Sequence, residues 1–229
     1  MNERYQRNVN ALSPEEVRLL HAKKVCVIGC GGLGGFVVEN LARLGILHIT
    51  VVDCDVFEPS NLNRQLYSSE SAIGAPKVEA AAKRIGEINS EVRIIGLKAR
   101  FDEATGVDLL AGHDAVIDAL DNIPSRLLLA EICRTLGIPL IHGSIAGWFG
   151  QVAAIFPGDK TMEILFGGID TDKGMETSLG NLPFTAALIA SLQSAECVKI
   201  LTGRGEILRN ALLLADLLSG EFRVLPLLD

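Results

Sequence analysis

One glycine-rich stretch has the spacing and the context of a nucleotide-binding turn. The sequence GCGGLG at residues 29–34 matches G-x-G-x-x-G through Gly29, Gly31, Gly32 and Gly34, between an apolar run and a helical apolar pattern. Glycines permit a tight turn there, and the free N–H groups of the following helix attract phosphate. Asp53, nineteen residues after Gly34, can accept hydrogen bonds from ribose hydroxyls. The pattern predicts a bound nucleotide and leaves ATP, NAD and FAD open.

Two cations and a carboxylate further along the chain favour one chemistry. Arg64 lies in SNLNRQ, Lys77 opens a predicted helix, and Asp121 lies in DALDN after a predicted strand. Hydride transfer does not need two cations beside the phosphates. Adenylyl transfer does, because charge grows on the phosphate oxygens as pyrophosphate leaves. Asp121 can supply the carboxylate that Mg²⁺ prefers, so these residues predict Mg-ATP in preference to NAD.

The rest of the sequence supplies the elements that must hold these groups. Apolar runs of strand length alternate with apolar-periodic helices, which predicts a Rossmann-like α/β fold with a doubly wound, mostly parallel sheet. After residue 151 the pattern changes, and we expect appended C-terminal antiparallel strands and a long helix on the same core. The predicted strands are 25–28, 47–52, 92–97, 115–117, 139–142, 151–156, 212–215 and 222–225. One predicted helix begins at Ser13, and the other predicted helices cover 35–44, 77–88, 124–136 and 183–201.

Composition argues against several classes of protein. The 229 residues are 48% hydrophobic and 21% charged, the balance of a soluble globular protein. A net charge of −7 without a basic cluster argues against a nucleic-acid partner. The most apolar region contains Gln193, Glu196 and Lys199, so it predicts a buried helix and no membrane span. The first residues lack the apolar stretch of a signal peptide, and we expect a cytoplasmic protein.

Nine short stretches along the chain match one family in order: RYQR at 4–7, GCGGLG at 29–34, VVDCD at 51–55, SNLNRQ at 60–65, IGAPKVEAAAKRI at 73–85, DALDN at 118–122, PLIHGS at 139–144, GQV at 150–152 and ECVKILTG at 196–203. Through them the sequence resembles the ThiF/MoeB/HesA family, bacterial relatives of the ubiquitin-activating enzymes. The resemblance covers nearly the whole chain and implies a single ThiF-type adenylation domain over residues 1–229. We expect an N-terminal arm and helix (1–22), a nucleotide-binding core (23–157), a mobile crossover loop (158–182) and a C-terminal helix with strands (183–229).

The resemblance implies an ATP-dependent adenylyltransferase that uses Mg²⁺. Its partner would be a ubiquitin-like sulfur-carrier protein with a C-terminal Gly-Gly tail, similar to ThiS or MoaD, serving thiamine, molybdopterin or tungstopterin synthesis. Asp53 would hold the ribose, Asp121 would position Mg²⁺, and Arg7 would reach the ATP of the other subunit in a homodimer. The implied catalytic residues are Arg7, Arg64, Lys77 and Asp121, and the implied nucleotide ligands are Gly29, Gly31, Gly32, Gly34, Asp53, Asp55, Asn61, Arg64, Lys77, Asp121 and Asn122.

Two features of many relatives are missing. Where relatives carry the first of two zinc-binding C-x-x-C pairs, residues 161–164 read TMEI, and the sequence ends in LLD before the second pair, so we expect no structural zinc. Where thioester- or persulfide-forming relatives carry a cysteine, eight residues before Pro183, this chain has Met175. Only a thiolate can be such a nucleophile, so we expect the activity to stop at the acyl-adenylate. The five cysteines are Cys26, Cys30, Cys54, Cys133 and Cys197. Cys133 and Cys197 lie in predicted helices and are expected in the core, whereas Cys30 and Cys54 flank the predicted nucleotide site and can react there, with filling as their expected role.

Other functions stay open on the sequence alone. Another carboxylate, such as a peptide C-terminus or a modified tRNA base, would use the same chemistry, although the lack of a basic face counts against tRNA. Met175 fits a regulatory subunit without catalysis, whereas the two cations and Asp121 argue against that and against an NAD-dependent oxidoreductase. Trp148 and Phe149 can line a groove for the carrier's tail, or belong to the core or a dimer contact. Asn122 could simply open a helix, and the RYQR arm is too polar to be expected in the core.

Overall fold

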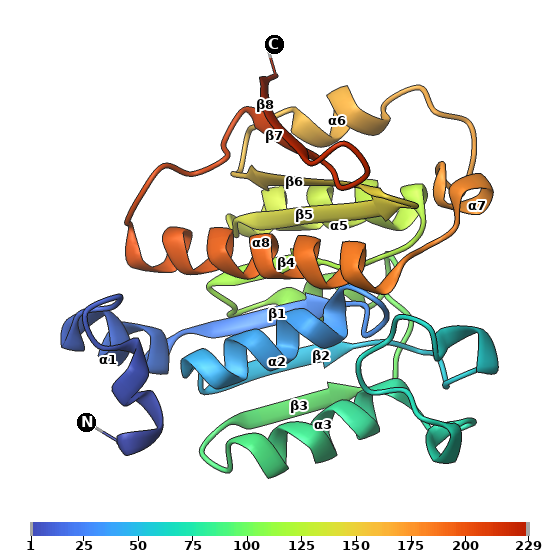
Figure 1. Ribbon diagram of the computed structural model, residues 1–229. Coiled ribbons are helices and arrows are strands. Elements are labelled where there is room, and N and C mark those ends of the chain that lie inside the picture. Colours follow the sequence, from blue (N-terminus) through green and yellow to red (C-terminus); the bar gives the residue numbers. More distant parts are fainter. Residues whose placement is uncertain (1, 228–229) are drawn as a thin grey trace.

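Eight strands form one sheet in the computed structural model, which describes residues 2–227 (Figure 1). The strand order is β3-β2-β1-β4-β5-β6-β7-β8, in which β1 to β5 run parallel and β6 to β8 are antiparallel to their neighbours. The predicted mostly parallel sheet with appended antiparallel strands is confirmed. The strands are β1 (Lys24–Ile28), β2 (His48–Val52), β3 (Arg93–Leu97), β4 (Ala115–Asp118), β5 (Leu140–Ala146), β6 (Phe149–Ile155), β7 (Ala211–Asp216) and β8 (Glu221–Pro226).

Helices cover both faces of this sheet. Figure 1 shows α2, α3 and α8 on one face and α5 on the other. Ser13 and Glu16 form the predicted capping box before α1, and α2 ends at Gly45, whose φ of +103° favours glycine. The sequence did not predict α4, because five residues are too few to show a helical period. The helices are α1 (Pro14–Ala22), α2 (Gly34–Leu44), α3 (Lys77–Ile88), α4 (Gly106–Leu110), α5 (Ile123–Leu136), α6 (Thr161–Phe166), α7 (Glu176–Leu179) and α8 (Pro183–Thr202).

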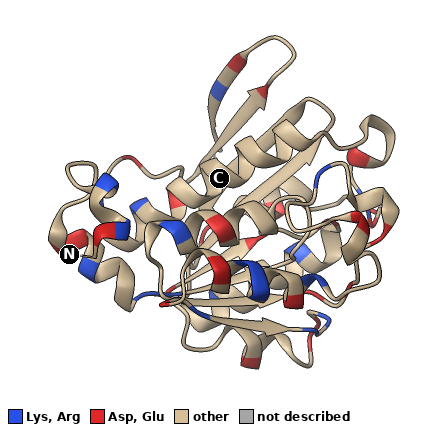
Figure 2. Cartoon of the chain, turned by 60° about the horizontal axis from the view of Figure 1, so that its bottom comes forward, with Lys and Arg blue, Asp and Glu red and all other residues tan. Residues whose placement is uncertain are grey.

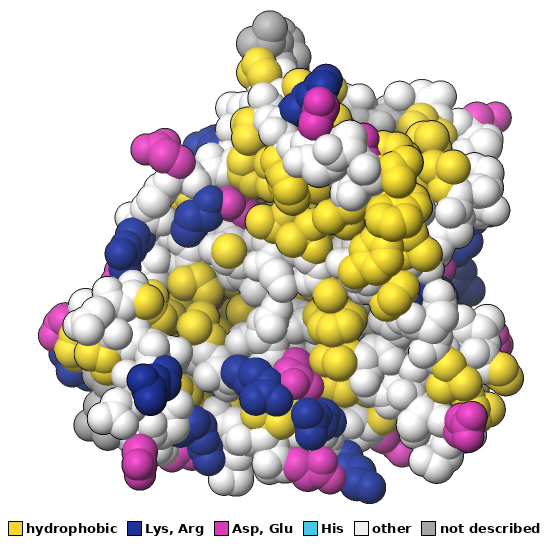
Figure 3. All heavy atoms as spheres, in the orientation of Figure 1, with side chains coloured by type: hydrophobic (Ala, Val, Ile, Leu, Met, Phe, Trp, Pro, Cys, Tyr) yellow, Lys and Arg dark blue, Asp and Glu magenta, His cyan; other side chains and the backbone are white. Residues whose placement is uncertain are grey.

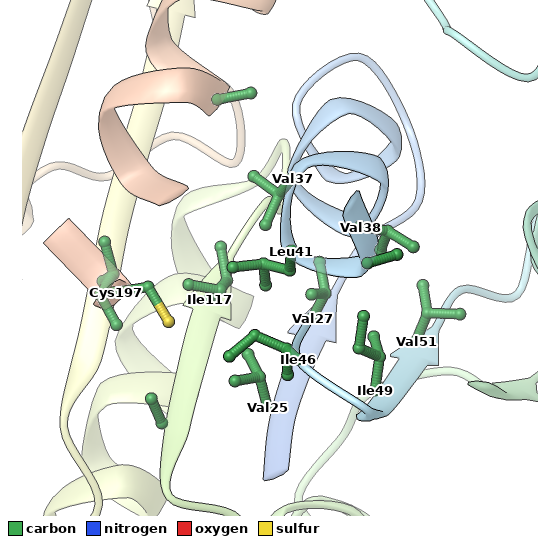
Figure 4. Packing of buried hydrophobic residues seen from close by; sticks show 14 of the residues in the cluster. Val25, Val27, Val37, Val38, Leu41, Ile46, Ile49, Val51, Ile117 and Cys197 are labelled. Atoms are coloured by element: carbon green, nitrogen blue, oxygen red, sulfur yellow. The ribbon is translucent and has the colours of Figure 1, made fainter. Parts of the chain in front are cut away.

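Alternate residues of the central strands face two separate hydrophobic layers. Val25 and Val27 of β1 belong to the cluster that contains α2 and α8, whereas Cys26 and Ile28 belong to the cluster that contains α5. Figure 4 shows the first layer, in which Leu41 of α2 lies over β1. Because both faces are buried, the strands are continuous apolar runs, and this made them visible in the sequence.

The N-terminal arm is anchored in the core, contrary to the expectation from its polar sequence. It forms the 3₁₀ helix η1 (Glu3–Asn8), and Tyr5 within it is fully buried. Tyr5 Oη accepts a hydrogen bond from Asn89 Nδ2 (2.8 Å), and its ring lies against His21 with the centroids 5.0 Å apart. A single aromatic residue among polar neighbours leaves no periodic pattern, so the sequence did not reveal this anchor.

Residues 158–182, expected to form a loop, contain two short helices. Met162 and Phe166 of α6 are buried in the same layer as α5, so the first half of this segment is packed onto the core. The second half contains α7, which has no buried residue. Two apolar residues four positions apart are enough to attach one helical face, even within a polar stretch.

The long helix α8 is a core element of the C-terminal half, as predicted. Among the described residues it is the one helix long and apolar enough to cross a membrane by length and composition. It packs along β5 and β6 and buries Ile189 and Ala190. Gln193 Nε2 donates to the main-chain oxygens of Asp118 (2.8 Å) and Ile141 (3.2 Å), so α8 also holds the ends of β4 and β5.

Candidate nucleotide site

A cavity of about 870 Å³ lies at the carboxyl ends of β1, β2 and β4. In the sheet β1 and β4 are neighbours. After β1 the chain continues to β2, on one side of this pair, and after β4 it continues to β5, on the opposite side of the pair. The loops after β1 and β4 therefore separate and leave a crevice between them. Ligands of open α/β sheets bind at this position, which makes the cavity the candidate site.

The glycines of the loop after β1 have two different roles. Gly29 has a φ of +98°, and a Cβ atom there would overlap the main-chain oxygen of Ala119. A Cβ atom on Gly34 would overlap the oxygen of Gly29, so Gly34 lets α2 pack against the turn and does not itself line the cavity. Gly31 and Gly32 line the cavity with bare main chain. They leave room for a phosphate at the N-terminus of α2.

Asp53 follows β2 and ties the glycine loop to it. Its Oδ2 accepts a hydrogen bond from Cys30 N (2.7 Å), and its Oδ1 accepts one from Asp55 N (2.8 Å). Burial raises the pKa of Asp53, although Lys77 and the two N–H groups oppose the rise. The residue lines the cavity, and each carboxylate oxygen keeps a further lone pair that can accept from a ribose hydroxyl.

Lys77 reaches the cavity from a buried position at the start of α3. Its side chain is 7% exposed, and its Nζ lies 2.8 Å from Asp55 Oδ2. The hydrogen bond from Lys77 is the main reason that the pKa of Asp55 is lowered. Because the lysine is already ordered by packing, contact with a phosphate would cost little further side-chain entropy.

Arg64 lines the cavity, but the neighbouring Asn61 does not. The Cγ and Cδ atoms of Arg64 lie beside Gly32 of the glycine loop, and its Nη1 donates to Asn63 Oδ1 (2.9 Å) and Ser60 O (3.1 Å). Asn61 is buried in the turn η2 (Pro59–Asn61), where its Oδ1 accepts the Glu58 N–H (3.0 Å). The structure therefore places Asn61 behind Arg64, in the turn that presents the arginine, and away from the expected triphosphate position.

Asp121 lies in the turn between β4 and α5 and is paired with a lysine. Lys173 Nζ lies 2.6 Å from Asp121 Oδ2, and both residues line the cavity. Partial burial favours the neutral acid, but Lys173, Asn122 and Arg126 outweigh it, so the pKa of Asp121 is lowered. Asn122 also lines the cavity. Its Oδ1 accepts the Ser125 N–H (2.9 Å) and caps α5, so the helix-opening role considered for it is present.

A buried polar network supports this turn. Asp118 and His142 are fully buried, with His142 Nδ1 2.7 Å from Asp118 Oδ2. Asp118 Oδ1 accepts the Leu120 N–H (3.0 Å), and Arg126 Nη2 donates to the Leu120 oxygen (2.6 Å). Burial lowers the pKa of His142 more strongly than Asp118 raises it. Asp118 does not line the cavity, so the first acid of DALDN positions the turn that carries Asp121.

Reasoning from the sequence missed several polar residues of the cavity, among them Gln65, Arg100 and Lys173. Gln65 is buried, and its Oε1 has no hydrogen-bond partner among the described residues, so it offers a free acceptor near Gly31. Arg100 follows β3, and Lys173 precedes α7. Both are single basic residues in loops, without a motif around them. For Gln65 the adjacent Arg64 was the available signal, because consecutive residues of one turn can face the same cavity.

Arg7 lies far from the cavity of its own chain. It belongs to η1, which precedes β1 and lies near the amino ends of the strands, whereas the cavity is at their carboxyl ends (Figure 1). Arg7 therefore does not contribute to the site formed by the same subunit. Its predicted action on the ATP of a partner subunit stays a prediction.

Four of the five cysteines are buried, and Cys54 is exposed. Burial raises the pKa of Cys133 and that of Cys197 to about 12, so these thiols are core residues as predicted. Cys54, which was expected to flank the nucleotide site, lines the cavity. Burial and the neighbouring carboxylates raise its pKa. Met175 is 69% exposed beside α7.

The polar groups of the cavity fit a nucleoside triphosphate with a divalent cation. Asp53, Cys54 and Asp55 offer atoms within 4.8 Å of one another, and Asp121 lines the same cavity. Mg²⁺ prefers carboxylate oxygens to a thiol, so the acids are the suitable donors. Lys77, next to Asp55, and the bare glycine loop, next to Asp53, line the same cavity and are suited to hold the phosphates. In the cartoon of Figure 2, basic and acidic residues are interspersed along the chain.

Residues 5–229 match the model of the ThiF family. The chain belongs to the ThiF family. It is 36% identical over 231 residues to the SAMP-activating enzyme E1 of Haloferax volcanii, covering 98% of this chain and 84% of that protein. It is 34% identical over 239 residues to the sulfur carrier protein adenylyltransferase of Thermus thermophilus, with coverage of 97% and 86%. Identity to the molybdopterin-synthase adenylyltransferase of Salmonella typhimurium is 31% over 237 residues, with coverage of 98% and 92%.

Some members of the family are longer, and solved structures share the fold. The chain spans 46% of a Zea mays relative described as an adenylyltransferase and sulfurtransferase. A crystal structure of E. coli MccB with ATP superposes with a TM-score of 0.81 over 99% of this chain and 72% of that chain, at 21% identity. At this identity the likeness supports the fold alone.

Proposed function

We propose that this protein uses ATP and Mg²⁺ to adenylate the C-terminal carboxylate of a ubiquitin-like sulfur-carrier protein. The observation that carries the proposal is the meeting of Arg64, Lys77 and Asp121 with the bare glycine loop in one cavity. Relatives that are named for activating sulfur carriers and SAMP, and that align over most of their length, support the protein substrate.

The reaction assigns each of these groups a task. A carboxylate oxygen of the carrier attacks the α-phosphorus, the bond to the bridging oxygen breaks, and pyrophosphate leaves while the acyl-adenylate forms. Arg64 and Lys77 neutralise the charge that grows on the phosphate oxygens. Asp121 would hold Mg²⁺, which would supply further positive charge beside the same oxygens. Asp53 holds the ribose.

The activity stops at the acyl-adenylate, and another protein supplies sulfur. Met175, eight residues before the first residue of α8, is exposed at the position where some relatives carry a cysteine, and a thioether cannot form a thioester. Cys54 lines the cavity, but its pKa is raised, which lowers the fraction of thiolate at neutral pH. The adenylate is therefore the form of the carrier that leaves or is passed on.

An apolar surface next to the cavity receives the body of the carrier. Figure 3 shows hydrophobic side chains gathered over β6, β7, β8 and the start of α8. Apolar patches on a single chain mark protein contacts, and the hydrogen bond from Gly147 N to Gly180 O (2.7 Å) places this surface beside the segment that lines the cavity. The exposed aromatic and apolar residues there are Trp148, Phe149, Phe184, Phe222 and Val224.

The working unit in this proposal is a symmetric homodimer in the cytoplasm. Arg7 cannot reach the cavity of its own chain, so it can act on ATP only from a second subunit. A two-fold axis gives both cavities the same arrangement. An arginine supplied in trans can neutralise the leaving pyrophosphate.

ATP–pyrophosphate exchange with purified sulfur carriers tests the proposal. We expect exchange that depends on one or more carriers and on their intact C-terminal Gly-Gly tail. Exchange with unrelated peptides but with no carrier would assign the chemistry to another carboxylate. Calorimetry that finds NAD binding and no ATP binding would exclude adenylation altogether.

A further inference from the structure

The segment around α7 contacts the rim of the cavity through an ion pair. We call residues 170–180 the strap. Lys173 Nζ lies 2.6 Å from Asp121 Oδ2, and the main-chain oxygen of Asp172 accepts the Ile123 N–H (2.9 Å) at the start of α5. The strap is thus attached to the turn that carries Asp121.

The remaining contacts of the strap hold it weakly. The side-chain hydrogen bonds of Thr171, Thr177 and Ser178 stay within the strap, and α7 has no buried residue. At its far end, Gly180 O accepts the Gly147 N–H. The centre of the strap therefore has little apolar burial to keep it in place, and the Lys173–Asp121 pair is one of the few contacts that attach it to the rest of the chain.

Lys173 neutralises the carboxylate that the proposed reaction assigns to Mg²⁺. An ammonium group and a divalent cation at the same carboxylate repel each other. We propose that Lys173 takes the place of the divalent cation at Asp121 in the empty enzyme, and that Mg-ATP displaces it and releases the strap. This inference rests on the proposed nucleotide site.

Release of the strap would open the route from the apolar surface to the cavity. The strap joins that surface at Gly147 and lines the cavity with Lys173, Glu176 and Thr177. A carrier tail that enters from the surface must pass this segment. Nucleotide would therefore bind first, and the tail would enter second.

The Mg²⁺ requirement of ATP binding tests the displacement. Calorimetric titrations with ATP over a series of Mg²⁺ concentrations compare the wild type with Lys173→Gln and with Lys160→Gln, an exposed lysine of the same connection outside the cavity. We expect the half-saturating Mg²⁺ concentration to fall about fivefold in Lys173→Gln, the scale of an exposed ion pair, and to stay unchanged in Lys160→Gln. An unchanged requirement in Lys173→Gln overturns the inference. A higher requirement also overturns it, because it would make Lys173 a phosphate ligand.

Hydrogen exchange of peptides that cover the strap provides a second readout, independent of turnover. We expect Mg-ATP to speed exchange in the wild type and in Lys160→Gln, and Lys173→Gln to exchange fast without nucleotide. Equal exchange of the empty wild type and Lys173→Gln contradicts the inference. If none of the three proteins binds ATP, the proposed nucleotide site itself fails; if ATP binds and both Lys173→Gln readouts match the wild type, only the displacement fails.

Discussion

Lys77 and Asp55 form an ion pair with very unequal burial. Their Nζ and Oδ2 atoms are 2.8 Å apart, yet the lysine side chain is 7% exposed and the aspartate side chain 61%. The cation is therefore the fixed half of the pair, and the acid can turn toward solvent. A phosphate that enters the cavity would meet an ammonium group already in position, which is the arrangement that favours the transition state.

Lys77→Ala should reduce carrier-dependent ATP–pyrophosphate exchange by a factor on the order of 10² or more, the scale for losing one preorganised charge. Lys83→Ala is the matched control, because Lys83 is an exposed lysine of the same helix. An exchange rate in Lys77→Ala equal to that of Lys83→Ala would remove Lys77 from the reaction.

Gly34→Ala should destabilise the protein by about 2 kcal/mol or more, because its methyl group would overlap the main chain of the loop. Gly86→Ala is the control. Gly86 lies in α3 with open space around it, so alanine there should stabilise by about 0.5–1 kcal/mol. Urea denaturation measures both. A neutral Gly34→Ala variant that still binds ATP would show that the close approach is not required.

Acidification should weaken the fold through His142. Burial lowers the pKa of His142 in the folded protein below the ordinary value of about 6.5. As the pH falls below about 6.5, the unfolded chain therefore binds a proton at this residue while His142 of the folded protein is still neutral. The free energy of unfolding therefore falls as the pH drops from about 6.5 toward the lower folded pKa. His142→Gln should lose less stability than the wild type between about pH 7.5 and 5.5. Identical pH profiles for wild type and His142→Gln would contradict this.

No covalent enzyme–carrier adduct should accumulate during turnover. Met175 stands eight residues before α8, where some relatives carry a cysteine. Burial raises the pKa of the Cys133 and Cys197 thiols to about 12. Denaturing gels without reductant, after incubation with carrier and Mg-ATP, provide the measurement. A thiol-sensitive band that disappears on mutation of Cys54 or another single cysteine would refute the expectation.

Mixing two inactive variants tests the shared site. Arg7→Ala and Asp121→Ala homodimers should each lose most of the exchange activity. After subunit exchange, one site of each heterodimer carries both intact residues, so roughly a quarter of the activity of the same concentration of wild type should return, with half of the dimers mixed and one good site in each. Proven exchange of subunits without recovery, or an active monomer, would rule out action of Arg7 in trans.

The sequence predicted the central sheet well because its strands are buried on both faces. Residues such as Val25 to Ile28 have no polar alternation to obscure the run, and the glycine loop and Asp53 lie at fixed spacings on either side of α2. The ion pairs within the cavity could not be predicted in the same way. Lys173 and Asp121 are 52 residues apart, and only the path of the chain around α6 and α7 brings them together.

Buried single residues explain the other differences. Tyr5 attaches an arm that looks polar, and Met162 and Phe166 attach α6, because one or two apolar side chains can fill a matching gap without a repeating pattern. Asn61 shows the converse. It belongs to a motif that resembles the family, yet its amide is used to close a local turn.

Strand β8 lies at the edge of the sheet, and all six of its residues are exposed. It carries Phe222 and Val224 on a free row of main-chain donors and acceptors, with Glu221 and Arg223 as the neighbouring charges. Such an edge can pair with the same strand of another copy and start irregular aggregation. Solubility of the isolated protein at high concentration should therefore be limited by this strand. Co-purification with the carrier, or the substitution Val224→Lys, should extend the usable concentration range.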